Sequence, residues 1–117
     1  MSATSTSNTK KQYLVVIQDF KDEKALERRM AVRDQHLAMA KANHPEYIVC
    51  GGAIFDSHES RNMVGSAMIC QAESEEELRE KLSKDPYVIG KVWEKWDIYP
   101  YRNAIGLEKE LPGPVII

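Results

Sequence analysis

The 117-residue sequence contains few cysteines and few histidines. Its two cysteines, Cys50 and Cys70, stand far apart at a spacing that zinc motifs do not use, and the three histidines form no paired-ligand pattern. We therefore predict no metal site. Two cysteines are also too few for a disulfide scaffold, so we expect both thiols to be reduced and buried in a cytoplasmic protein.

The sequence also lacks an excess of basic charge and a long hydrophobic run. The net charge is −2, and aromatic residues are not interleaved with lysine and arginine as a nucleic-acid surface requires. The longest nearly unbroken apolar run, 47–55, is far shorter than the ~20 residues of a membrane-spanning helix. We therefore expect neither nucleic acid nor a membrane as a partner.

The length and composition indicate one globular domain, because 43% of the residues are hydrophobic and 29% are charged. Residues 1–11 are rich in serine and threonine, which predicts a flexible N-terminal tail. An organellar targeting segment is an alternative for this stretch, although it contains no arginine. The folded domain is predicted over 12–102. Residues 103–117 form a C-terminal extension whose apolar end is expected to dock on the domain.

Hydrophobic patterning predicts four strands and two helices. The alternation of apolar residues predicts strands over 12–20, 47–55, 63–73 and 92–101. A helix is expected from Asp22, as its N-cap, to about Asn43, and a second helix begins at the capping box Ser74-x-x-Glu77. Asp85-Pro86 ends this second helix and suits the start of another turn.

This order of elements predicts a ferredoxin-like α+β fold, with a four-stranded antiparallel sheet and two helices on one face. The strand 12–20 is apolar on both sides, with Tyr13, Val15 and Ile17 facing one way and Leu14 and Val16 the other. Because two helices cover only one face, we expect a second subunit to cover the other face. The predicted homodimer packs its two sheets face to face and encloses a cavity.

Five polar or aromatic residues are candidates for a functional site. His36 suits a general acid and base, because imidazole titrates near neutral pH, although a helix histidine also makes purely structural hydrogen bonds. Asp85 suits the partner of His36, although an N-cap before Pro86 explains an aspartate equally well.

Arg33 is a cation at the edge of an apolar helix stripe that we predict to be buried and that consists of Leu26, Met30, Leu37 and Ala40. It either binds an anionic substrate group or forms an internal ion pair. Ser66 and Tyr99 are further candidates for substrate binding, through a hydroxyl beside a strand glycine and an aromatic ring.

Several short motifs together resemble the YCII-related domain family. These motifs are Arg33-x-x-His36-Leu37, the Gly51-Gly52 strand, Gly65-Ser66, and Asp85-Pro86-Tyr87 followed by Gly90. The resemblance extends from about Tyr13 to Arg102 and implies a dimeric α+β barrel. It also implies an active site in which His36 pairs with Asp85. The sequence departs from the family at Ala53, where proline is frequent, and in its longer end after Arg102.

We therefore predict a cofactor-free lyase or isomerase that uses His36 and Asp85 for proton transfer. The family resemblance implies a small, aromatic-derived ligand, and Arg33 suits an anionic one. The alternative is a non-catalytic module of the same fold that binds a small molecule or another protein.

Overall fold

The computed structural model describes residues 10–106. The chain runs through β1 (Lys11–Asp19), α2 (Ala25–Ala42), β2 (Ile48–Phe55), β3 (Met63–Ala72), α3 (Glu75–Ser83), α4 (Pro86–Ile89) and β4 (Trp93–Tyr101). This is the predicted ferredoxin-like α+β order, with the single turn of α4 added before the last strand. The predicted tail 1–11 and the docking of the C-terminal end lie largely outside the described residues, and both stay predictions.

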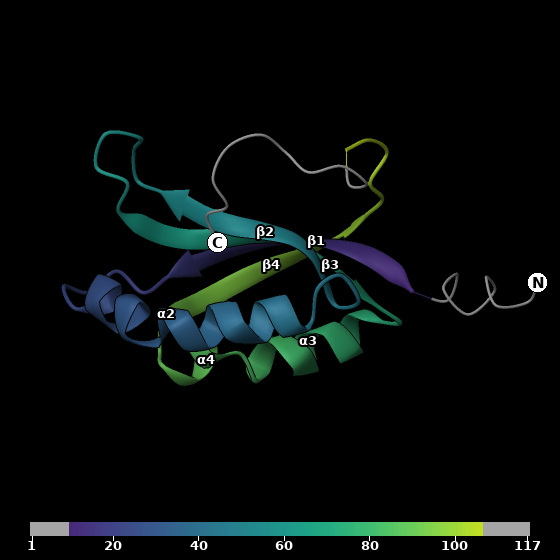
Figure 1. Cartoon of the computed structure of the whole chain (residues 1–117), viewed down its shortest axis with the longest axis horizontal. Helices are drawn as coiled ribbons and strands as arrows, with labels where there is room; N and C mark the ends of the chain where they lie inside the picture. The colour runs from purple at the N-terminus through teal and green to yellow at the C-terminus, as the bar shows by residue number, and fades with distance from the viewer. Residues whose placement is uncertain (1–9, 107–117) are drawn as a thin grey trace, which may run out of the picture.

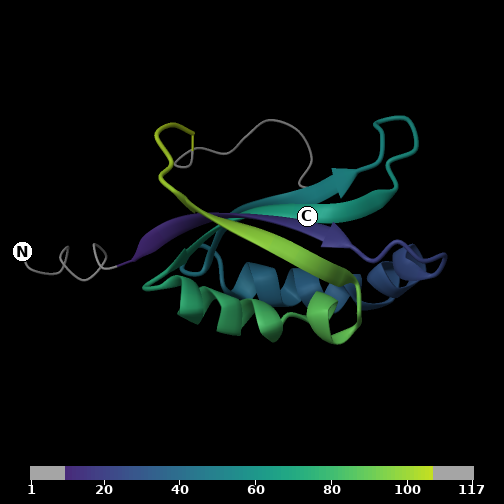
Figure 2. The same ribbon diagram turned by 180° about the vertical axis from the view of Figure 1, so that it is seen from behind.

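The four strands form one antiparallel sheet in the order β2-β3-β1-β4. The hydrophobic strand β1 therefore lies inside the sheet, and β2 lies at an edge. Figures 1 and 2 show α2, α3 and α4 packed against one face of this sheet, whereas no helix of residues 10–106 covers the other face, which we call the helix-free face. The helix-covered face therefore contains the core of the chain.

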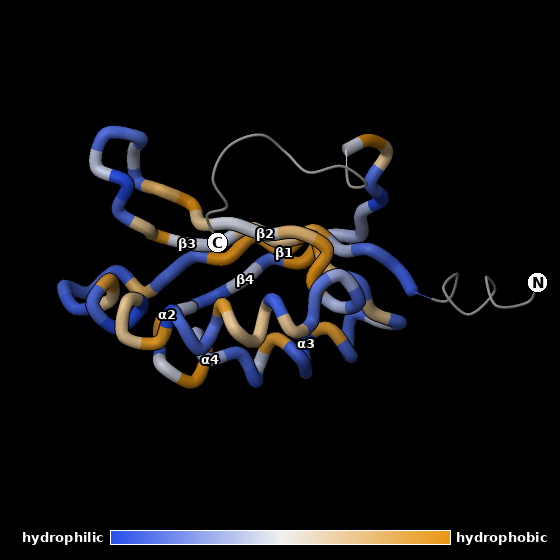
Figure 3. Tube along the Cα trace, viewed as in Figure 1, coloured by the Kyte–Doolittle hydropathy of each residue, from blue (hydrophilic) through white to orange (hydrophobic). Residues whose placement is uncertain are grey.

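The alternation predicted for β1 is confirmed by burial. Tyr13, Val15 and Ile17 are buried beneath the helices, whereas Leu14 and Val16 are half-buried on the helix-free face. The same alternation holds in β3, where Met68 and Cys70 face the helices. Figure 3 shows hydrophobic colour along the middle of the sheet and hydrophilic colour in the loop between β2 and β3.

The buried side of α2 differs from the predicted apolar stripe. Leu26 and Met30 are 37% and 51% exposed, whereas Arg29 and His36 are buried together with Ala40. The prediction was wrong for the first half of the helix because it placed apolar residues inside. Here the buried side carries polar residues, each paired with a carboxylate.

The predicted helix caps are found at two of the three positions. Ser74 Oγ accepts a hydrogen bond from Glu77 N (3.1 Å), and Asp85 caps α4 by accepting one from Tyr87 N (2.9 Å). The cap predicted at Asp22 is wrong, since α2 begins at Ala25 and has no side-chain cap. The Asp22 carboxylate accepts a hydrogen bond from Lys24 N (3.2 Å), before the helix begins, and two from Nη1 (2.7 Å) and Nη2 (2.8 Å) of Arg28.

Both cysteines are free thiols, but only one of them is buried. Cys70 lies in the core, whereas Cys50 pairs with Ile69 and is exposed in the single chain. The prediction of two buried thiols is therefore wrong for Cys50 in the isolated chain. In the part of the chain that the structure describes, its strand β2 has no neighbouring strand on the outer side, and no helix covers Cys50.

Candidate active site

His36 and Asp85 form a buried hydrogen-bonded pair between α2 and the residue that precedes α4. Nδ1 of His36 lies 2.9 Å from Oδ1 and 3.2 Å from Oδ2 of Asp85. The two side chains are 2% and 1% exposed. Because a carboxylate only accepts hydrogen bonds, Nδ1 carries the proton and Nε2 is left as the basic nitrogen. This arrangement orients the imidazole for proton exchange at Nε2.

Two local features fix the position of Asp85. Its backbone N–H donates to Leu82 O (3.1 Å) at the end of α3, and its side-chain Oδ1 accepts from Tyr87 N. Pro86 then begins α4 with a backbone angle already suited to a helix. Asp85 therefore acts as a cap and contacts His36 at the same time.

Aromatic rings enclose His36. The Tyr87 ring stacks on the imidazole with centroids 4.0 Å apart and planes at 18°, and Trp93 meets it edge-on at 5.7 Å. Tyr87 and Trp93 are both buried. The apolar surroundings strengthen the electrostatic interaction between His36 and Asp85, because little water screens it.

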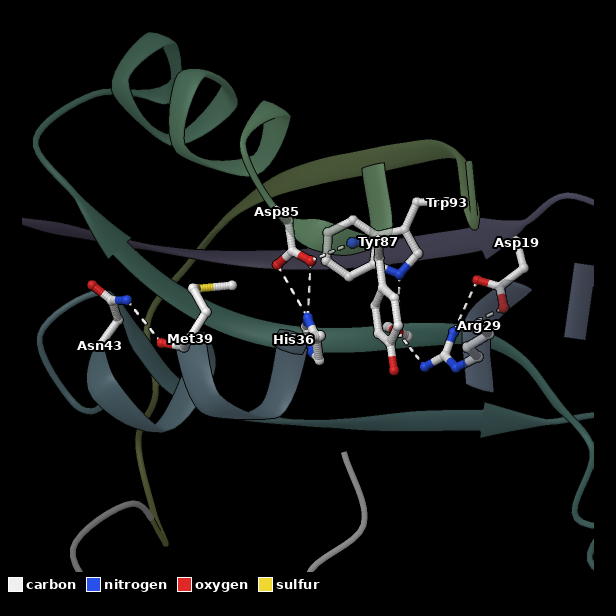
Figure 4. A network of polar contacts seen from close by, with 9 residues as sticks. Asp19, Arg29, His36, Met39, Asn43, Asp85, Tyr87 and Trp93 are labelled. Carbon is white, nitrogen blue, oxygen red and sulfur yellow. Dashed lines mark hydrogen bonds and ion pairs between the residues drawn. The ribbon is translucent and has the colours of Figure 1, made fainter. Parts of the chain in front are cut away.

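A second buried polar group lies next to this pair and is centred on Arg29. Nη1 of Arg29 contacts both carboxylate oxygens of Asp19 (3.0 and 2.8 Å), and Nη2 donates to Ser66 Oγ (2.9 Å). Trp93 Nε1 also donates to Ser66 Oγ, at 3.3 Å. The Arg29 guanidinium lies 4.5 Å from the centre of the Tyr87 ring. Figure 4 shows these residues as a row from Asp85 and His36 through Tyr87 to Arg29 and Asp19.

Sequence reasoning missed Arg29, although a signal was present. Arg29 lies one turn before Arg33 and two turns before His36, so all three occupy one side of a helix. Asp19, at the end of an apolar strand, was a carboxylate with which a buried arginine could pair. The apolar residues Leu26 and Met30 led us to predict a different buried side of α2, so the polar side was not recognised.

Burial changes the ionisation of two residues of the Arg29 group. Desolvation raises the pKa of Asp19 above its ordinary value, and the attraction of Arg29 opposes this change. Desolvation likewise raises the pKa of Tyr87, against the opposing charges of Arg29 and Arg33. The Tyr87 hydroxyl therefore keeps its proton at neutral pH, although it has no hydrogen-bond partner among residues 10–106.

The other predicted site residues take different positions. Ser66 is buried within the Arg29 group, as described above. Arg33 is half-buried on α2, and its Nε is buried without a partner among residues 10–106. Tyr99 is 50% exposed and pairs with Leu14 on the helix-free face. The sheet therefore separates Tyr99 from His36, and its role in substrate binding stays a prediction.

Two hollows reach the two ends of the buried row. A hollow of about 190 Å³ reaches Asp85, and its lining consists of Met39, Asn43, Tyr47, Lys81, Lys84 and Asp85. A larger cleft of about 650 Å³ reaches Asp19 at the other end, between the start of α2 and the β2–β3 loop. The larger cleft lies within the size range of small-molecule sites.

Within residues 10–106, no cluster of three or more histidine, cysteine, aspartate or glutamate residues is arranged to hold a metal ion. No helix in this part of the chain is long and apolar enough to cross a membrane.

Several proteins resemble this chain in sequence. Fusaric acid biosynthesis protein 2 of Gibberella fujikuroi is 31% identical over 103 residues, which cover 80% of this chain and 94% of the relative. Aspercryptin biosynthesis cluster protein B of Emericella nidulans is 29% identical over 90 residues, or 72% of this chain. The match spans only 56% of that second, longer relative.

A solved structure has the same fold. It is 5-chloro-2-hydroxyhydroquinone dehydrochlorinase (TftG) of Burkholderia phenoliruptrix AC1100, in complex with 2,5-dihydroxybenzoquinone. The superposition has a TM-score of 0.69 at 21% identity and covers 80% of this chain and 95% of TftG. The family described as the YCII-related domain matches residues 12–102 of the sequence. The chain therefore belongs to the YCII-related domain family.

Proposed function

We propose that this protein is a small-molecule enzyme of the lyase or isomerase type that uses His36 and Asp85 for proton transfer. The observation that carries the proposal is the contact of Nδ1 of His36 with the Asp85 carboxylate at 2.9 Å, inside an aromatic enclosure. A buried histidine held in one tautomer by a carboxylate is the usual arrangement of a general base.

The chemistry follows from the free nitrogen of His36. Nε2 removes a proton from the substrate, and the electron pair of the broken bond forms a new double bond. In an elimination, a leaving group departs with its own electron pair, so that a proton and an anion are lost together. In an isomerisation, His36 returns the proton at another atom. Asp85 stabilises the imidazolium that forms between the two steps.

The comparisons support a small-molecule reaction of this kind. Dehydrochlorination, the activity in the name of TftG, is an elimination of a proton and chloride. The names of the two fungal relatives place them in the biosynthesis of small molecules. No part of the proposed step requires a bound cofactor.

We also infer that the protein functions as a homodimer whose subunits pack through the helix-free face. Leu14 pairs with Ile69 on one side and with Tyr99 on the other, so these residues form a continuous row across this face. Val16 and Ala67 form part of a second row. A second copy of the same sheet provides an apolar surface that matches the first row and the apolar part of the second, which ends at Asp97. The free thiols support the predicted cytoplasmic location.

The test of the catalytic assignment compares three proteins. The wild type, His36→Gln and His58→Gln are assayed with 5-chloro-2-hydroxyhydroquinone, cyclic enols and hydroxymuconate-like acids, by product absorbance and, for the chlorinated compound, by chloride release. We expect His36→Gln to lower turnover ~10²–10⁴-fold, as the loss of a general base does. His58→Gln is the matched control, because His58 is exposed in the β2–β3 loop.

Two results would contradict the proposal. Full turnover by His36→Gln on a substrate of the wild type would exclude His36 as the base. The second result is measured by tryptophan fluorescence. If the protein binds 2,5-dihydroxybenzoquinone saturably but turns over none of the compounds, a non-catalytic binding module is favoured.

A further inference from the structure

Four buried polar atoms have no hydrogen-bond partner among residues 10–106. They are Nε of Arg29, Nε of Arg33, and the hydroxyl oxygens of Tyr47 and Tyr87. Most buried polar groups in proteins are paired, so a cluster of unpaired donors indicates a missing partner. Three of the four atoms belong to one group beside His36, and Tyr47 is the exception.

Arg29, Arg33 and Tyr87 come together through α2 and α4. The guanidinium of Arg29 lies 4.5 Å from the Tyr87 ring centre, and Arg33 follows Arg29 by one helical turn. The positive charges of both arginines act on the Tyr87 hydroxyl, although burial has the larger effect on its pKa and raises it. Because Arg33 is half-buried, this group of donors extends from the core to the protein surface.

The two arginines of this group differ in their partners. Asp19 neutralises Arg29, and Asp85 faces His36. Arg33 has no salt bridge with any described residue of the chain, and its Nε lacks even a neutral partner. Arg33 and the protonated phenol of Tyr87 therefore offer hydrogen-bond donors to an anionic oxygen, since neither has an acceptor among the described residues.

The hydrogen bonds of Arg29 favour a single anionic oxygen over a carboxylate at this residue. Both terminal nitrogens of Arg29 are already bonded, Nη1 to Asp19 and Nη2 to Ser66, so the fork that grips a carboxylate is occupied. Among the described residues, the Nε–H of Arg29 and the O–H of Tyr87 have no acceptor, and they are single donors rather than a fork. Trp93 lies edge-on to Tyr87 with centroids 5.5 Å apart, so aromatic rings surround these donors.

We propose that Tyr87, with Nε of Arg29 and Nε of Arg33, binds the ionised hydroxyl of a phenolic or enolic ligand beside His36. The proposal rests on the proposed function, because it assigns this oxygen to the substrate of the His36 site. It adds Tyr87 as a substrate-binding residue and names the substrate class. Binding releases the proton of the ligand hydroxyl to the solvent.

The experiment measures binding alone, with 4-nitrophenol as the probe. Its ionised form absorbs visible light, so an absorbance titration reports both binding and ionisation. We expect the wild type to bind the probe as nitrophenolate at a pH where the free probe is mainly neutral. Loss of a hydrogen bond to a charged group weakens binding about 10–100-fold, which is the expected effect of Tyr87→Phe.

Two further variants make the result specific. Tyr47→Phe is the matched control, because it also removes a buried unpaired hydroxyl but one outside this group. It is expected to bind like the wild type. Arg33→Gln is the second test and is expected to reduce the fraction of bound probe that is ionised, even where Tyr87→Phe does not fold.

Three outcomes would overturn the inference. They are equal binding of nitrophenolate by Tyr87→Phe and the wild type, binding of the neutral ether 4-nitroanisole as tight as that of 4-nitrophenol, and preferential binding of benzoate. Each can occur while His36→Gln still abolishes turnover. Failure of this inference is therefore distinguishable from failure of the proposed function.

Discussion

His36 stacks face to face on Tyr87, with ring centroids 4.0 Å apart and an interplanar angle of 18°. The backbone N–H of the same tyrosine donates to Asp85, which in turn contacts His36. One residue of α4 therefore holds both members of the pair, through its ring and through its backbone. The position of the proposed base depends on this short helix as much as on α2.

Removing the Tyr87 ring should destabilise the protein strongly. Tyr87 is fully buried, so Tyr87→Ala is expected to lower the free energy of unfolding by about 3–5 kcal/mol. Tyr87→Phe keeps the ring and removes only a hydroxyl without a partner in the described chain, so it should cost far less. Urea unfolding of the three proteins measures the difference. Equal stability of the alanine and phenylalanine variants would contradict the packing described here.

The two neighbouring arginines of α2 should differ in their contribution to stability. Arg29→Met leaves the buried Asp19 carboxylate without its partner, which is expected to cost about 3–5 kcal/mol. Arg28→Met breaks the pair with Asp22, whose side chains are 31% and 51% exposed, so solvent screening makes its loss much smaller. Urea denaturation at pH 7 compares the two. A larger loss in Arg28→Met would show that the Arg29 pair does not stabilise the fold.

Asp22 should stabilise the protein in a pH-dependent way. Hydrogen bonds from Arg28 lower the pKa of its carboxyl group from 3.8 to about 2. A group with a lowered pKa in the folded state contributes stability above its unfolded pKa and loses it as the pH falls through the folded value. The stability difference between the wild type and Asp22→Asn should therefore be constant above about pH 5 and shrink toward pH 2. Urea midpoints at several pH values test this, and a difference that grows on acidification would contradict it.

A charge on the helix-free face should separate the proposed dimer. Val16 lies between Ala67 and Asp97 on this face, so Val16→Asp places a second carboxylate in the expected interface. Light scattering at micromolar concentration should give a dimeric mass for the wild type and a monomeric mass for the variant. Ile89→Asp is the control, because Ile89 is 72% exposed on α4. A monomeric wild type, or a dimeric Val16→Asp protein, would contradict this interface.

The two thiols should react with a maleimide at very different rates. Cys70 is 0% exposed, and burial raises its thiol pKa to about 12, so we expect no reaction until the protein unfolds. Cys50 is exposed in the single chain, and its pairing with Ile69 places it at the helix-free face. It should react faster in Val16→Asp than in the wild type, as measured by mass spectrometry. Equal rates for Cys50 in the two proteins would indicate that a partner does not cover it.

The sequence by itself determined the order of the elements and much of their detail. Alternation of apolar residues identified each strand, and the start of α3 followed from Ser74 and Glu77. These features are local, because a strand face repeats every two residues and a cap contacts the next turn. The motifs also identified the YCII-related family, which the family match over residues 12–102 confirms.

Only the tertiary structure decided which polar residues are buried and what they contact. Arg29 is 10 residues from Asp19 and 37 from Ser66, and no sequence motif joined these three residues. The family resemblance implied the pair of His36 and Asp85, which lie 49 residues apart, but not their burial or the rings around them. The apolar pattern predicts Leu26 and Met30 on the buried side of α2. It does not include the distant partners that make the burial of a charged residue favourable. Tyr87 was assigned only to a turn motif, and its ring reaches His36 because α4 packs against α2. The candidate site therefore depends on contacts between distant segments, which no local pattern in the chain encodes.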